Sequence, residues 1–580
     1  MSLQIDLIHK LRSAPASFWS GLVKKYFTRP HVTVIGVPSK KMVAQFAENE
    51  KARIEQQRRK LGEEGMKKCE EDLRQAKEEN AREPNVELFQ EFIVREQEVF
   101  NRFRVDADSN LGDSALSQRA AKFLKQSPFP TTLHNCPTKF IEMFLLLDSS
   151  GLTTEQRAWL LLYIDLLFES PAKIDRELKS ADEVTMLYTK DLVNHSAHAG
   201  ISDFFDKFVA LRIVVDAETG FLHLAKWAEI FTTGIVFDVH RVKQRAQKLA
   251  NDAREFERDA CCVAETALDV MTNQTNTNSY MISALVLEEF HEKVAKWCVS
   301  HPTEVIKKLE EVRSALFCRG VNAHFVCSVD LIDNKSFEPQ QWSFVEKSFG
   351  KAEKFMARSG ESVDTKFAGR QKVLGVGGSE SSFICIACMM DCDWMSDALV
   401  PTMLLAKYLG LPDGPLWCAI RGSGLAYGAK MYVYLNELTI TLHLNNCAHP
   451  VQACEKAKKC VKQVVEGGVV VESEFEAAKR KLIGQIMERE ETVSGAGILS
   501  IIGRIRGSPP DYQKQLCERI WNASTEDMIL LGGPRVANLF ENYALAITVH
   551  PSKVPEIKAA FPDIEEATVS SLNFISALFV

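Results

Sequence analysis

The succession of predicted elements occurs twice in this chain. Residues 105–332 and residues 373–580 each show patterns typical of a strand, a helix, a second strand and helix, a long helix, shorter helices and a closing strand. The closing strands resemble each other: Val32-Thr-Val-Ile-Gly-Val-Pro-Ser-Lys is similar to Ala546-Ile-Thr-Val-His-Pro-Ser-Lys, and Ala323-His-Phe-Val-Cys occupies the same place in the middle unit. Three closing strands for two complete units lead us to expect that the chain opens with the tail of an earlier copy.

This repeat predicts an α+β fold with two successive αβ domains, each a mixed sheet with helices packed on it. The arms of a linker rich in Lys, Arg, Glu and Gln are expected at residues 41–61 and 64–83. We divide the chain into the tail of a preceding truncated αβ domain (1–40), a helical-hairpin linker (41–104), the first αβ domain (105–332), a polar connector (333–372) and the second αβ domain (373–580).

Periodicity also predicts individual elements within these segments. Thr153 and Gln156 form a capping box that predicts the start of a helix. One long helix is expected over residues 239–271. Strands are expected over residues 31–37, 140–147, 208–215, 321–331, 382–389, 431–444 and 543–550.

Composition excludes several classes of function. The chain has 580 residues and a net charge of -7, so it offers no electrostatic footprint for nucleic acid. It contains no apolar run of about 18 residues, and no membrane span is expected. Its fifteen cysteines are scattered and several lie in apolar runs, which is typical of reduced thiols in an intracellular protein. We therefore predict a cytoplasmic location, with the mitochondrion as the alternative.

One bend carries the candidate functional residues. A short apolar helix through Trp417 should end at Arg421, where Gly422 and Gly424 break it before Tyr427 and a strand. The simplest interpretation is a helix C-cap, with an arginine that complements the helix dipole and a half-buried tyrosine. The alternative interpretation is a functional pair, in which a cation and a phenol are held six residues apart.

Other motifs do not support a site of their own. Gly375-Val-Gly-Gly-Ser precedes a strand, whereas a dinucleotide-binding loop follows one. Cys385 and Cys388 lie three apart on a predicted strand, so they should point to opposite faces and pack in the core rather than bind metal. Gly422-Ser-Gly424 leads into a strand, the wrong order for a serine nucleophile elbow. The charged linker has too few apolar positions for a sustained coiled coil.

Taken together, two αβ units, a helical linker and Arg421-Gly-Ser-Gly-Leu-Ala-Tyr427-Gly428 resemble the M16 (pitrilysin, inverzincin) zinc metallopeptidases, presequence-protease branch. The resemblance implies the C-terminal half of such an enzyme, which would enclose peptides in a closed chamber. It also implies that Tyr427 stabilises the oxyanion and that Arg421 holds the substrate. Gly422, Gly424 and Gly428 would let the peptide backbone approach closely.

The zinc-binding half of this family is absent from the sequence. No histidine begins a His-x-x-Glu-His motif, and His195-Ser-Ala-His198 has no glutamate between its histidines. We therefore expect no metal site in this chain, and we expect the zinc cofactor in a missing N-terminal half or partner subunit. The chain alone should not hydrolyse peptides. The alternative hypothesis is a non-catalytic M16-like binding or assembly subunit.

Overall fold

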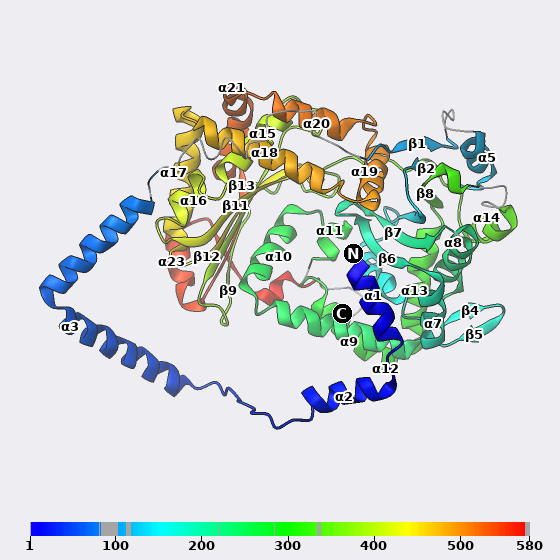
Figure 1. Cartoon of the computed structure of the whole chain (residues 1–580), viewed down its shortest axis with the longest axis horizontal. Helices are drawn as coiled ribbons and strands as arrows, with labels where there is room; N and C mark the ends of the chain where they lie inside the picture. Colours follow the sequence, from blue (N-terminus) through cyan, green and yellow to red (C-terminus); the bar gives the residue numbers. More distant parts are fainter. Residues whose placement is uncertain are drawn as a thin grey trace. The chain divides into compact units, whose positions relative to one another are not determined.

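The computed structural model divides the chain into two compact units, residues 1–94 and residues 95–580 (Figure 1). The first unit is helical, and the second contains every sheet of the described chain. The described residues are 2–80, 82, 103–111, 118–217, 220–283, 285–332 and 338–574.

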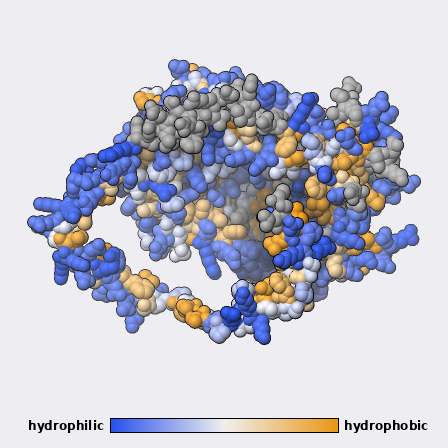
Figure 2. All heavy atoms as spheres, viewed as in Figure 1, coloured by the Kyte–Doolittle hydropathy of each residue, from blue (hydrophilic) through white to orange (hydrophobic). Residues whose placement is uncertain are grey.

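The first unit consists of the helices α1 (Ser2–Arg12), α2 (Ala16–Tyr26) and α3 (Lys40–Asn80). No residue of α2 or α3 is buried, and Figure 2 shows α3 as a hydrophilic surface with scattered apolar side chains. Helical geometry is broken at Gly62, where φ is 62° and ψ is -175°. The arms predicted on either side of this glycine are therefore the two limbs of one bent helix rather than a hairpin with packed arms (Figure 1).

The strand predicted at residues 31–37 is wrong. This segment has no regular secondary structure, and the side chains of Val32 and Val34 are 91% and 87% exposed. A strand needs a neighbour to satisfy its backbone amides, and the described residues supply none here. Residues 83–102 of the predicted linker lie outside the described residues.

The first αβ domain is built on a six-stranded sheet with the strand order β1-β2-β8-β3-β7-β6. β2 and β8 are parallel, and all other neighbours in this sheet are antiparallel. A small hairpin of β4 (Ala172–Ile174) and β5 (Glu177–Lys179) lies outside the sheet. The sheet strands are β1 (Asp106–Ser109), β2 (Thr131–Asn135), β3 (Phe140–Asp148), β6 (Asn194–Ile201), β7 (Phe204–Asp216) and β8 (Val321–Cys327).

The second αβ domain contains a six-stranded sheet with the order β11-β12-β10-β13-β9-β14. β9 runs parallel to β13 and to β14, and the other neighbours are antiparallel. The strands are β9 (Gln371–Gly375), β10 (Ser382–Met389), β11 (Ala426–Tyr434), β12 (Thr439–Cys447), β13 (Tyr543–Val549) and β14 (Glu565–Ala567).

The two sheets confirm the predicted repeat. Five strands of the first sheet, β6-β7-β3-β8-β2, match β11-β12-β10-β13-β9 of the second in spatial order, chain order and direction. Only the sixth strands differ, because β1 comes before the other strands of its sheet in the chain and is antiparallel to β2, whereas β14 comes after the others and is parallel to β9. The described chain thus has two α+β, sheet-bearing domains, as the sequence predicts.

Helices surround both sheets, and none in the described part of the chain is long and apolar enough to cross a bilayer. The predicted capping box is present: Gln156 N donates to Thr153 Oγ1 at 3.2 Å, and Thr153 N to Gln156 Oε1 at 3.0 Å. The first domain and connector hold α5 (Gln118–Gln126), α6 (Thr154–Leu166), α7 (Ala181–Asp191), α8 (Gly220–Glu229), α9 (Val239–Phe256), α10 (Ala260–Thr272), α11 (Asn278–Met281), α12 (Glu288–Ser300), α13 (Pro302–Phe317) and α14 (Ser343–Ser348). The second domain holds α15 (Leu399–Leu409), α16 (Pro415–Ile420), α17 (Pro450–Gly467), α18 (Glu472–Glu488), α19 (Val493–Arg506), α20 (Tyr512–Trp521), α21 (Thr525–Asp527), α22 (Gly533–Ala537) and α23 (Val554–Ala560).

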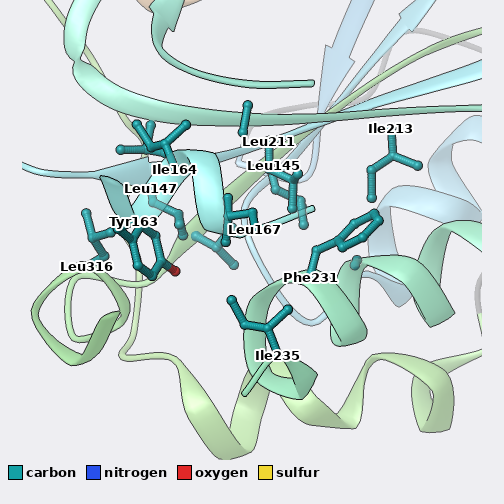
Figure 3. Close-up of a cluster of buried hydrophobic side chains, with 14 of the residues drawn as sticks. Leu145, Leu147, Tyr163, Ile164, Leu167, Leu211, Ile213, Phe231, Ile235 and Leu316 are labelled. Carbon is teal, nitrogen blue, oxygen red and sulfur yellow. The ribbon is translucent and has the colours of Figure 1, made fainter. Parts of the chain in front are cut away.

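One face of each sheet packs against helices of its own domain. In the first domain, Leu145 and Leu147 of β3 and Leu211 of β7 lie in a cluster with Phe231 and residues of α6 and α13 (Figure 3). In the second domain, Ile384 of β10 packs with residues of α15 and α17 in the same way. Burial of each such side chain contributes about 1.5–3 kcal/mol, so these faces are the main cores.

The opposite face of each sheet, which we call its inner face, is covered by a helix exchanged from the other domain. α10 comes from the first domain but packs on the second sheet, where Val263 contacts the cluster that contains Ala387 of β10. α19 comes from the second domain and packs on the first sheet, where Ile501 joins the cluster that contains Phe144 of β3. This exchange ties the two αβ domains into one compact unit.

Two predicted elements are divided in the structure. The helix expected over residues 239–271 is α9 and α10, because Asp259 begins a new helix by accepting hydrogen bonds from Cys261 N and Cys262 N. The strand expected over residues 431–444 is a hairpin of β11 and β12. Its turn includes Leu438, which adopts a left-handed φ of 55° that a leucine rarely takes.

Candidate functional site

The candidate site lies where α16 turns into the edge strand β11. Gly424 has a φ of +70°, a left-handed conformation that favours glycine. A Cβ atom on Gly422 would lie 2.5 Å from a backbone carbonyl oxygen of α16, so only glycine fits there. A hydrogen bond of 3.0 Å from Leu425 N to Ile420 O closes the turn. The turn fixes where the residues on either side of it point.

Arg421, at the C-terminal end of α16, lies against two aromatic rings. Its Cζ atom is 4.3 Å from the centroid of the Tyr427 ring and 5.4 Å from that of Trp417. Within the described ranges, its guanidinium group has neither a hydrogen bond nor an ion pair to a protein group. Cation–π contacts of this kind contribute about 0.5–2 kcal/mol and leave the N–H donors available.

Tyr427 is the second residue of β11, and its side chain is 64% exposed. Its hydroxyl group also has no hydrogen-bond partner among the described residues. The half-buried tyrosine of the simplest interpretation is therefore not what the structure contains. Arg421 and Tyr427 are instead in contact, and together they present unpaired donors at the surface that a carbonyl oxygen can accept.

The three glycines of the bend differ in what the fold demands of them. Gly422 and Gly424 are required by the turn itself, as their geometry shows. At Gly428 a Cβ atom would meet only the Asn445 Cβ at 3.8 Å, an ordinary contact. Packing therefore does not require glycine at position 428, and this residue leaves open surface beside Tyr427.

The described residues do not fit a zinc site. No group of three or more His, Cys, Asp or Glu side chains among them could hold a metal ion. The ring centroid of His195 on β6 lies 4.6 Å from the ring centroids of both Phe168 and Tyr188. Burial lowers the pKa of His195. His134 Nε2 and His324 Nδ1 share a hydrogen bond of 3.0 Å. Burial lowers the pKa of His324 to about 3. Neither arrangement supplies the three protein ligands that a catalytic zinc site needs.

The cysteines of the motif around Cys385 and Cys388 pack in the hydrophobic cores and do not form a metal site with other described residues. All fifteen are free thiols. Cys385 lies in the cluster under α10 and Cys388 in the main core on the other face, as strand geometry predicts. Burial raises the pKa of Cys388 to about 12, so this thiol stays protonated and unreactive.

Comparison with known proteins finds a relative of high identity. An uncharacterized protein of Caenorhabditis elegans is 47% identical over 576 residues, which cover 98% of this chain and 58% of the worm protein. The chain thus spans somewhat more than half the length of this relative. No protein-family model matches the sequence.

Solved structures share the fold at low identity. A peptidase M16 inactive domain from Pseudomonas fluorescens gives a TM-score of 0.55 at 11% identity, covering 77% of this chain and 98% of that one. The ferredoxin protease FusC, solved as a mutant in complex with Arabidopsis ferredoxin, gives a TM-score of 0.54 at 12% identity, covering 79% of this chain and 48% of that one. The fold of this chain is therefore M16-like.

Proposed function

We propose that this chain is the C-terminal half of a zinc metalloendopeptidase of the M16 type, similar to the presequence proteases, that degrades peptides in a closed chamber. The M16-like fold supports this proposal, as does the 58% coverage of the worm relative, which leaves room for a second half. The observation that carries it is the Arg421–Tyr427 contact, which holds two unpaired donors at the edge of the second sheet.

In this proposal the two side chains act on the substrate carbonyl. The Tyr427 hydroxyl donates a hydrogen bond to the oxygen that gains negative charge as the peptide bond is attacked. A phenol suits this role because it donates while neutral at pH 7. Arg421, held by the rings of Tyr427 and Trp417, holds the substrate backbone or the same carbonyl oxygen. Gly422, Gly424 and Gly428 form the edge of the surface on which the peptide lies.

The metal belongs to another part of the assembly in this proposal. Zinc would supply a Lewis acid and an activated water when bound, but the described residues of this chain do not fit it. The partners are peptide substrates and an N-terminal catalytic half, either of the same protein or in a partner subunit. We propose the cytoplasm as its location, with the mitochondrion as the alternative.

The test is reconstitution. The chain with added zinc should leave a fluorogenic peptide uncut. Mixing it with a second polypeptide, the part of the C. elegans relative outside the matched segment, should give cleavage that a chelator abolishes. Cleavage by the pure chain alone would refute the proposal that the catalytic zinc lies in another polypeptide. A mixture that associates but cleaves nothing would favour the non-catalytic binding or assembly subunit instead.

A substitution then tests Arg421 within the active mixture. Arg421→Ala should lower kcat/KM at least about tenfold, because a charged hydrogen bond to the substrate is lost. The matched control is Arg480→Ala, since Arg480 also lies over an aromatic ring, that of Trp521 at 5.5 Å, but on α18. Equal effects of the two substitutions would remove Arg421 from the site.

A further inference from the structure

A cavity of about 540 Å³ lies between the inner face of the second sheet and the exchanged helix α10. Its walls come from the turn between β6 and β7, from α10 and α11, and from the β11–β12 hairpin, all within the second compact unit (Figure 1). Both αβ domains therefore contribute to it. Neither Arg421 nor Tyr427 lines it.

The cavity wall is acidic. Five carboxylates line it, against one histidine and, among the described lining residues, no lysine or arginine: Asp203, Asp206, Glu265, Asp269 and Glu437. His443 pairs with only one of them, Glu265, at 3.6 Å. The wall therefore favours a cationic occupant.

Two of these carboxylates have neutral partners only. Asp269 accepts a hydrogen bond from Ser283 Oγ at 3.1 Å, and Glu437 accepts one from Asn436 Nδ2 at 3.3 Å. Neither has an ion pair within the described part of the chain. Burial raises the pKa of Asp269 to about 7, with nearby Glu265 adding to the shift, so an entering cation would favour the ionised form of Asp269.

Two buried oxygen atoms on the wall lack partners, which is an independent sign of a ligand. Thr441 on β12 is 5% exposed, and its Oγ1 has no hydrogen-bond partner among the described residues. Asn273, just after α10, is 8% exposed, and its Oδ1 is likewise unpartnered. Buried polar atoms almost always have a partner, so this pair points to one that fills the cavity.

We propose that this cavity binds an organic cation, either a primary ammonium or a guanidinium group. Asp269 and Glu437 supply the counter-charge, and Thr441 Oγ1 and Asn273 Oδ1 accept hydrogen bonds from the N–H donors. A metal ion suits the site less, because no three of the described carboxylates and histidines are grouped closely enough to hold one. An organic cation carries several donors on a larger frame, which matches acceptors spread over four elements.

This inference does not rest on the proposed peptidase function. Two sources supply the same chemistry, a free diamine and the lysine or arginine side chain of a peptide. Isothermal titration of the full chain at pH 8 distinguishes them, with 1,5-diaminopentane in one arm and the peptide acetyl-Ala-Lys-Ala-amide in the other. Binding in the first arm alone assigns a free diamine, binding in the second alone a side chain, and binding in both the shared chemistry. The same peptide with norleucine in place of lysine should not bind.

Variants locate the binding in the cavity. Asp269→Asn and Glu437→Gln should each weaken the bound cation at least about tenfold, because each removes a charged acceptor. Thr441→Val should weaken it about five- to tenfold without unfolding the chain, since the hydroxyl has no protein partner to lose. The matched control, Glu455→Gln on the exposed side of α17, should leave the affinity unchanged. Unaltered affinity in all three cavity variants, equal binding of the norleucine peptide, or no binding of either cation would overturn the proposal.

Discussion

On the inner face of the first sheet, the buried carboxylate Glu142 has a cation beside it, whereas Asp269 and Glu437 at the inner face of the second sheet have no ion pair among the described residues. Glu142 of β3 forms an ion pair with Arg212 of β7, and Ser494 of the exchanged α19 donates to the same carboxylate at 3.0 Å. Asp269 and Glu437 at the second sheet have only neutral donors. The spaces beside these groups also differ, at about 210 and about 540 Å³.

The difference shows how one repeated architecture can serve two purposes. The two sheets share five strands in the same order, and each receives a helix from the other domain. In the first, isoleucines of α19 and the Glu142–Arg212 pair complete a packed core. In the second, α10 also packs on the sheet, and carboxylates without a cation among the described residues line the cavity of about 540 Å³ beside that contact. An arginine of the fold neutralises Glu142 at the first inner face, and in our proposal a bound organic cation does so for Asp269 and Glu437 at the second.

The largest expected effect concerns the pH dependence of stability. Because burial near Glu265 and Glu437 raises the pKa of Asp269 to about 7, the folded state keeps a proton that the unfolded state loses near pH 4. Stability should fall as pH rises from about 4 to about 7, by up to about 4 kcal/mol for this group, and Asp269→Asn should remove that fall. Urea unfolding at pH 5 and pH 8 should record about 3 kcal/mol of this fall, because the remainder lies below pH 5. Asp148→Asn is the control, since Arg319 helps to lower the pKa of Asp148, and it should leave the slope in this range intact.

Breaking the Glu142–Arg212 ion pair should lower the free energy of unfolding by about 3 kcal/mol. Arg212→Met leaves Glu142, whose side chain is 7% exposed, as a buried charge without a cation. The free energy of unfolding by urea should drop by that amount, and the double variant with Glu142→Gln should recover most of it. A single variant as stable as the parent would mean that the first inner face tolerates unpaired charge as the second does.

The packed face should also reject added volume. A Cβ atom on Gly497 of α19 would lie 2.5 Å from Val326 of β8, so Gly497→Ala should destabilise the chain by about 1–3 kcal/mol. Gly484→Ala on α18 meets nothing within 4 Å and should stabilise it by about 0.5–1 kcal/mol. Thermal unfolding should show a lower midpoint for Gly497→Ala and a higher midpoint for Gly484→Ala. Midpoints that shift in the same direction for both variants would contradict this prediction.

Removal of a hydroxyl should have opposite signs at two buried threonines. Thr441→Val deletes an unpartnered oxygen and should stabilise the unliganded chain by about 1 kcal/mol. Thr402→Val deletes a hydroxyl that donates to Ala398 O at 2.8 Å and should destabilise it by about 1 kcal/mol. Loss of stability at both positions would show that the Thr441 hydroxyl has a partner within the fold.

Sequence patterns predict the repeat, the main strands and the opposite facing of Cys385 and Cys388, because these depend on local periodicity. The division of residues 431–444 into two strands is not predictable in the same way. Its turn contains no glycine or proline, and Leu438 takes the left-handed φ that those patterns assign to glycine. Asp259, which begins α10, is a capping residue inside a helical pattern and is the signal that could have divided residues 239–271.

The candidate site is predictable only where it is local. Arg421 and Tyr427 are six residues apart, and a glycine turn brings them into contact. The cation cavity, in contrast, joins Asp269 and Thr441 across the helix exchange. A local sequence pattern cannot predict contacts between residues that meet only because a helix of one domain packs on the sheet of the other.

Tyr427→Phe in the reconstituted mixture tests the proposed function most directly. Loss of one donor to the developing oxyanion should lower kcat at least about 100-fold with little change in KM. Tyr432→Phe is the matched control, because Tyr432 lies on the same strand with its side chain 38% exposed, and it should keep parental activity. A Tyr427→Phe mixture as active as the Tyr432→Phe mixture would contradict the role of the Arg421–Tyr427 pair.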